Sequence, residues 1–179
     1  MQSRTVVADA SFYLCFLEDI RRPDVLIFVN PSFDFMITPI VFDEVSVCSN
    51  YGSIKGKFTL IQAASQYNMT EILRPFFAED QVKKGESEVI ALAFFIFDQG
   101  DLKNFILDDE PARKFVLNNL PILKNSMTGT VGFIALCACE YSLMTKEYSL
   151  QVLKEIERSP FRIESHILSN IIDKISNYC

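Results

Sequence analysis

The chain has 179 residues, of which 49% are hydrophobic and 22% charged, as is typical of a single globular domain and not of a disordered chain. The net charge of −6 argues against strong, non-specific binding of nucleic acid through an overall positive field. It does not exclude a nucleic-acid substrate, since bound cations reverse the charge of an acidic site locally. The most apolar stretches, residues 89–97 and 131–144, are shorter than the ~20 residues that span a bilayer. We therefore expect one domain over residues 1–179, located in the cytoplasm and without a membrane segment.

The first half of the sequence alternates short β-branched runs with helical patterns. We expect strands at residues 5–8 and 35–38, and helices at residues 11–20 and 40–48. Residues 26–29 fit either the end of a helix or a short strand. The glycines and lysines of residues 51–57 predict a loop. A short helix at residues 58–67 and an extended segment at residues 71–77 are expected next.

The second half continues the alternation and ends in helices. A helix that begins near Gly85 is apolar on every side over residues 89–97, so we expect it to be buried. Residues 104–107 and 121–123 are predicted to be strands, with a helix at residues 111–118 between them. A long apolar helix is expected at residues 130–144. Amphipathic helices at residues 149–158 and 164–178 would form a C-terminal helical region from about residue 148.

Strands that alternate with helices predict an α/β fold with a mainly parallel sheet covered on both faces. In such sheets the ligand site lies beyond the carboxyl ends of the strands. Asp9 follows the first predicted strand, and Asp108 and Asp109 follow the strand at residues 104–107. These acids are therefore expected at the edge of the sheet where a ligand would bind.

Five cysteines are an odd number, and their spacing matches no zinc motif. Cys137 and Cys139 would point to different faces of a helix, because neighbours on one face are three or four residues apart. We expect buried free thiols and neither a metal site nor a redox site.

Each acid also has a structural interpretation. Asp9 could cap the helix that follows it. One of Asp108 and Asp109 could cap the helix that starts with Pro111, which would leave the other without a structural role. Two adjacent carboxylates repel each other unless a cation offsets their charge.

The remaining acids lie on predicted helices. Glu86 and Glu88 are both in the first turn of the buried helix, where the helix dipole favours anions, but residues two apart cannot point the same way. Glu88 shares a face with apolar residues, where a carboxylate is costly without a metal or hydrogen-bond donors. Glu44 could equally be a solvated residue, and His166, the only histidine, is expected on the surface.

Taken in order, five segments resemble the PIN-domain family and most closely its VapC-like prokaryotic branch. The segments are VADAS at 7–11, TPIVFDE at 38–44, GESEVIALA at 85–93, LDDEPAR at 107–113 and TGTVG at 128–132. The resemblance covers about residues 6–144. It implies a three-layer α/β/α sandwich and cleavage of RNA phosphodiester bonds that depends on Mg²⁺ or Mn²⁺.

The family's acidic positions match Asp9, Glu44, Glu88 and Asp109, with Asp108 as an adjacent metal ligand. Many relatives carry Asp where this chain has Glu88. We expect Asp9 and Asp109 to be the main ligands, because hard cations prefer carboxylate oxygens. Thr128 or Thr130 would orient a metal-bound water or a substrate phosphate. Relatives often act as toxins restrained by an antitoxin protein and form homodimers, so both partners are expected here from the resemblance.

Two alternatives remain open. A PIN-like domain with little catalysis would serve as a binding or assembly module. A phosphoryl-accepting receiver or a phosphatase would also use an acidic pocket, but the sequence lacks an Asp-x-Asp pattern after its first strand.

Overall fold

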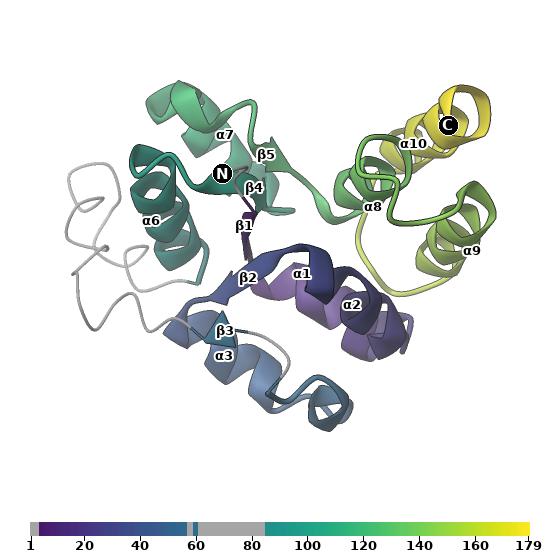
Figure 1. Ribbon diagram of the computed structural model, residues 1–179, viewed down its shortest axis with the longest axis horizontal. Coiled ribbons are helices and arrows are strands. Elements are labelled where there is room, and N and C mark those ends of the chain that lie inside the picture. Colours follow the sequence, from purple (N-terminus) through teal and green to yellow (C-terminus); the bar gives the residue numbers. More distant parts are fainter. Residues whose placement is uncertain (1–3, 57–58, 61–84) are drawn as a thin grey trace.

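A five-stranded parallel sheet with the order β3-β2-β1-β4-β5 organises the molecule (Figure 1). The computed structural model describes residues 4–56, 59–60 and 85–179. The strands are β1 (Thr5–Ala8), β2 (Asp34–Ile37), β3 (Thr59–Leu60), β4 (Leu102–Ile106) and β5 (Met127–Thr128). All four residues of the central strand β1 are buried, as expected of a β-branched run covered on both faces.

Helices cover both faces of the sheet and confirm the expected α/β/α sandwich. In Figure 1, α6 (Gly85–Asp98) and α7 (Glu110–Asn119) lie on one side of the sheet. On the other side lie α1 (Ala10–Leu14), α2 (Pro23–Val29) and α8 (Thr130–Cys139). The apolar helix α6 packs on β1 and β4, which explains why it has no polar face.

Most expected elements are confirmed, with shifted ends. The helix expected at residues 11–20 is α1 followed by a π-helical turn, η1 (Cys15–Asp19), and residues 26–29 belong to the helix α2. The helix expected at residues 40–48 is α3 (Pro39–Ser46). The expected loop after it contains the short 3-10 helix η3 (Tyr51–Ser53), and another, η2 (Asn30–Ser32), follows α2.

Three predictions are wrong in part. Pro121–Leu123 is a 3-10 helix, η4, and the edge strand is the later β5. The helix expected at residues 130–144 ends at Cys139, and Ser142 beyond it has a left-handed φ of 53°. Thr59–Leu60 form a strand instead of the start of a helix, because they pair with Met36 and Ile37 at the sheet edge. The rest of that predicted helix, and the extended segment at residues 71–77, lie outside the described residues.

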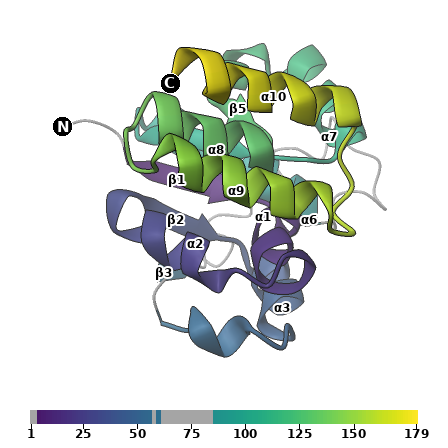
Figure 2. The same ribbon diagram turned by 90° about the vertical axis from the view of Figure 1, so that its right-hand side faces the viewer.

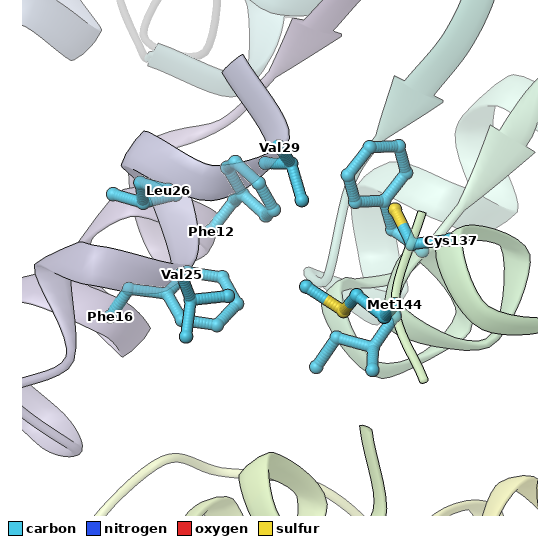
Figure 3. Close-up of a pocket in the computed structure, with 9 residues that line it drawn as sticks. Phe12, Phe16, Val25, Leu26, Val29, Cys137 and Met144 are labelled. Carbon is cyan, nitrogen blue, oxygen red and sulfur yellow. The ribbon is translucent and has the colours of Figure 1, made fainter. Parts of the chain in front are cut away.

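Aromatic side chains fill the layer between the sheet and α8. The Phe12 ring contacts the rings of Tyr13, Phe16, Phe35 and Phe133 at centroid distances of 5.1–5.8 Å. Figure 3 shows the side chains of α1, η1 and α2 facing those of α8 across a cavity of about 10 Å³. Such a volume holds about one water-sized probe, so this apolar gap is a packing defect and not a ligand site.

The C-terminal helices α9 (Lys146–Glu157) and α10 (Ser165–Tyr178) pack against α8, side by side with it in Figure 2. An ionic contact joins this layer to α2: the Arg22 guanidinium donates to both carboxylate oxygens of Glu155 at 2.9 and 3.0 Å, and to Asp24. Of the helices in the described ranges, none is both long and apolar enough to cross a bilayer.

The expectation for the cysteines is right for two buried thiols and wrong for one pair. Cys15 and Cys137 are buried and free, and Cys48 is free and half-buried. Cys139 at the end of α8 and the terminal Cys179 form a disulfide. Their separation of 40 residues gave no motif by which the sequence could predict this pairing.

Candidate active site

The sheet order places its topological switch point between β1 and β4. From β1 the chain proceeds outward through β2 and β3, and it then returns to pair β4 with the other side of β1. Open α/β sheets bind ligands at such a point, beyond the carboxyl ends of the strands. Asp9 follows β1 there, and Asp108 comes two residues after β4, so both acids stand where the fold favours a site.

Asp9 is a buried carboxylate, with only 3% of its surface exposed. It accepts hydrogen bonds from the backbone N–H of Phe12, as the cap of α1, and of Asp108, both at 3.2 Å. Burial, and then repulsion from Asp108, raise the pKa of Asp9 to about 7, against the opposing effect of the two hydrogen bonds. Glu86 adds a further repulsion. Among the described residues, no basic side chain offsets this charge.

Asp108 is held by the start of α8. Its Oδ1 accepts from the Thr130 backbone N–H at 2.9 Å, and its Oδ2 accepts from the Thr130 hydroxyl at 2.5 Å. Burial raises the pKa of Asp108, while these hydrogen bonds and the nearby Arg113 guanidinium act in the opposite direction. Arg113 is itself fixed by a 2.8 Å hydrogen bond to the Leu107 carbonyl. Thr130 therefore positions an acid, and its hydroxyl is already engaged.

The two glutamates in the first turn of α6 have different surroundings. The Glu88 carboxylate accepts from the Ile40 backbone N–H at 3.1 Å, in the first turn of α3. Burial is the main cause of the raised pKa of both Asp9 and Glu44. The charge of the half-buried Glu86 raises both pKa values further. A Cβ atom added to Gly85 would lie 3.5 Å from Glu44 Oε1, so α3 brings this acid close to the start of α6.

Asp109 and Thr128 lie further from this group. Asp109 is exposed and caps α7, because its Oδ1 accepts from the Ala112 backbone N–H at 2.8 Å. The Thr128 hydroxyl donates to the Gly129 carbonyl at 3.3 Å. The structure therefore makes electrostatic neighbours of Asp9 and Asp108, of Asp9 and Glu86, and of Glu86 and Glu44.

Of these acids, Glu86, Asp108 and Asp109 border an open cavity of about 850 Å³, which we call the acidic cavity. Its walls come from α1 and η1, the start of α6, the start of α7 and the linker between α9 and α10. They are formed by Ser11, Leu14, Glu18, Asp19, Glu86, Asp108, Asp109, Glu110, Pro111, Pro160, Phe161 and Arg162. The dominance of acids on these walls suits a cation better than a free anion.

The donor chemistry of this edge fits a hard divalent cation, because oxygen ligands and uncompensated negative charge are what Mg²⁺ and Mn²⁺ require. The side chains are not arranged as a finished metal site. In the described part of the chain, no three His, Cys, Asp or Glu residues converge to hold one ion. Asp9 and Asp108 are instead bonded to backbone and hydroxyl groups.

The family model described as PIN domain matches residues 5–177. The chain belongs to the PIN domain family. Members of this family are generally nucleases, and this PIN domain carries Asp9 and Asp108 at the expected edge of the sheet. Neither the curated proteins nor the solved structures include a significant match to the chain.

Two features of this PIN domain were not assigned from its sequence. Glu86 was weighed only as a helix-dipole residue, although its position directly after Gly85 places it beside α3. Arg162 borders the acidic cavity from a linker about 150 residues after Asp9, and no local pattern marks it. Only the packing of α9 and α10 on α8 brings that linker to the site.

Proposed function

We propose that this PIN domain is a ribonuclease that hydrolyses RNA phosphodiester bonds with Mg²⁺ or Mn²⁺. One observation carries the proposal: Asp9 is a buried carboxylate at the switch point of the sheet, surrounded by acids and without a basic partner among the described residues. A fold retains such a costly group when a bound cation offsets its charge.

Asp9, Asp108, Glu86 and Glu44 would hold the cation. Asp9 and Asp108 supply the central oxygens, and Glu86 and Glu44 extend the site from α6 and α3. Asp109 borders the same cavity with one carboxylate oxygen engaged as a cap, which suits it to bind a metal-bound water. Glu88 supports the site indirectly, since its bond to Ile40 holds α3 against α6. A divalent cation bound there would activate water and stabilise the leaving oxygen at phosphorus.

The preference for RNA, the toxin role, the antitoxin partner, the homodimer and the cytoplasmic location follow from the resemblance to VapC-like proteins. Support for a nucleic-acid substrate comes from the size of the acidic cavity, which is open enough for a polymer strand, and from Arg162 on its wall. A cation at the acids would turn this locally negative surface into one that attracts phosphate.

A second function is favoured by a specific observation. Because no three acids converge on one point in the described residues, the domain could instead bind RNA or a protein without cleaving it. Cleavage of single-stranded RNA in Mn²⁺ separates the two functions. We expect the parent protein to cleave the RNA, and we expect Asp9→Asn and Asp108→Asn each to cleave at least about 100-fold more slowly.

The matched control is Asp43→Asn, which removes an exposed carboxylate from α3 outside the site and should cleave like the parent. In a second control, Ca²⁺ replaces Mn²⁺ in the assay, so that RNA binding is measured separately from cleavage. Equal cleavage by the parent and both site variants would rule out the proposed site. Binding without cleavage in all proteins would favour the second function.

A further inference from the structure

A second cavity adjoins the acidic cavity, with a volume of about 560 Å³. It lies between the start of α8 and the first turns of α10, and Arg113, Arg162, Ile163, Ile167 and Ile171 border it. Asp108, Glu110 and Arg162 border both cavities, so the two lie side by side at the candidate metal ligand Asp108. Pockets of roughly 300–1,000 Å³ with apolar walls and a few polar groups are typical of small-ligand sites.

The walls of this cavity combine apolar side chains, two arginines and the carboxylates of Asp108, Glu110 and Glu164. Ile167, 42% exposed, and the partly buried Ile163 and Ile171 present apolar surface from the α10 side. The opposite wall includes Thr128, Gly129, Val131 and Gly132, around the start of α8. A Cβ atom at Gly129 would lie only 2.8 Å from Asp108 Oδ1, so a side chain at this position would displace the Asp108 carboxylate.

The two arginines supply positive charge to a cavity that Asp108, Glu110 and Glu164 also border. Arg113 is fixed by its bond to the Leu107 carbonyl. Arg162 is exposed and, within the described ranges, forms no hydrogen bond or ion pair, so its guanidinium is available to a ligand. Guanidinium groups bind phosphate and stack on planar rings. The cavity therefore offers an apolar slot and an anion contact together.

We propose that this second cavity, which we call the nucleotide pocket, binds one nucleotide of a single-stranded RNA next to the phosphodiester that is cleaved. The base lies against Ile163, Ile167 and Ile171, and its phosphate contacts Arg162. This proposal rests on the proposed ribonuclease function, because Asp108, which borders both cavities, places the pocket beside the reacting phosphate. Single-stranded RNA fits because an unstacked base can enter a pocket.

The pocket has consequences for specificity. A base held one nucleotide from the cleaved bond makes the enzyme select sequence at that position, whereas phosphate contacts alone carry no sequence information. The apolar side chains on the α10 side contact the flat face of a base and form no hydrogen bonds with its edges. The bases should therefore differ mainly in how well they stack, and purine nucleotides, with the larger rings, should bind more tightly than pyrimidine nucleotides.

The test is a metal-free titration of the protein with AMP, GMP, CMP and UMP, followed by the isoleucine methyl signals in two-dimensional NMR. We expect millimolar or tighter binding, with shifts at Ile163, Ile167 and Ile171. Ile167→Asp should weaken binding at least about tenfold, and Arg162→Ala about threefold or more. The controls are Ile122→Asp and Arg158→Ala, which change exposed residues outside the pocket and should bind like the parent.

Absence of shifts at these isoleucines, or equal affinities in the pocket and control variants, would overturn the proposal. Inorganic phosphate is titrated in parallel, and shifts as large as those with AMP would show an anion site without a base, which also overturns it. Because the titration needs neither metal nor cleavage, a protein that binds nucleotides but cuts no RNA would refute only the proposed function. A protein that cuts RNA with unchanged preference in Ile167→Asp would refute only the pocket.

Discussion

The segment formed by α1 and η1 has two sides with opposite energetics. On one side, Phe12 and Phe16 enter the aromatic layer beneath α8, where almost no surface is exposed. On the other side, Ser11, Glu18 and Asp19 border the acidic cavity. The aromatic side stabilises the fold, whereas the acidic side gathers like charges. The comparison shows that a costly site can be maintained because a well-packed core holds its supporting helix in place.

The π-helical turn η1 belongs to this division. Its signature is the hydrogen bond from the Ile20 backbone N–H to the Cys15 carbonyl at 3.0 Å, one residue longer than in an α-helix. Cys15, Phe16 and Leu17 remain buried while Glu18 and Asp19 reach the cavity. Such single turns are frequent at functional sites.

The largest effect is expected from removing an aromatic anchor. Phe12→Ala should lower the free energy of unfolding by about 3–5 kcal/mol, because the ring is fully buried among four others and leaves a cavity behind. Urea denaturation measures this change. Phe28→Ala, at a residue 52% exposed, is the matched control and should cost far less. Equal losses would mean that the aromatic layer is not the stabilising side.

The next effect tests the acidic side through pH. The pKa of Asp9 rises from 3.8 to about 7 on folding, so the folded state binds the proton of Asp9 more tightly than the unfolded state does. The resulting stabilisation of the fold is fully present below about pH 4 and is lost as the pH rises through about 7. The full shift corresponds to on the order of 4 kcal/mol. Without metal, the melting temperature of Asp9→Asn should therefore exceed that of the parent by an amount that grows from pH 4 to pH 8.

Thermal melts in EDTA at several pH values measure this difference. Asn retains one acceptor oxygen for two backbone donors, so the net gain should be smaller than the full shift. Asp43→Asn, at an exposed position, should track the parent at every pH. A melting difference between Asp9→Asn and the parent that stays constant with pH would contradict the account of Asp9.

The smallest effect separates two residues of one helical turn. Glu86→Gln should weaken Mn²⁺ binding at least about tenfold, because it removes a charge beside Asp9 and Glu44. Glu88→Gln should change Mn²⁺ affinity less than about twofold. Its amide oxygen can still accept from the Ile40 N–H. Titration calorimetry measures both affinities, and the reverse ranking would assign Glu88 to the metal.

The sequence predicted the framework of this site through strong local signals. A β-branched run before Asp9 and an apolar strand before Asp108 placed both acids at the correct edge, because parallel strands share one direction. The apolar pattern after Gly85 correctly predicted a buried helix. These features depend on periodicity and strand ends, which a single sequence contains.

Other features depend on packing that the sequence does not display. Whether Glu86 or Glu88 faces the acids is decided by the approach of α3 to α6, and not by any property of the turn itself. The cap of α7 was expected from one of two adjacent acids, and the structure gives it to Asp109. The two-residue strands β3 and β5 are too short to carry a pattern.

The pairing of β1 with β4 also determines when the site can exist. The bond from the Asp108 N–H to Asp9 joins residues 99 positions apart, so neither acid has its partner until most of the chain has been made. At about 5–20 residues per second, ribosomal synthesis of that interval takes on the order of 5–20 s. Thr130, which holds Asp108, emerges later still. A nascent chain therefore lacks the bonded Asp9–Asp108 pair, and with it the candidate site, throughout this interval.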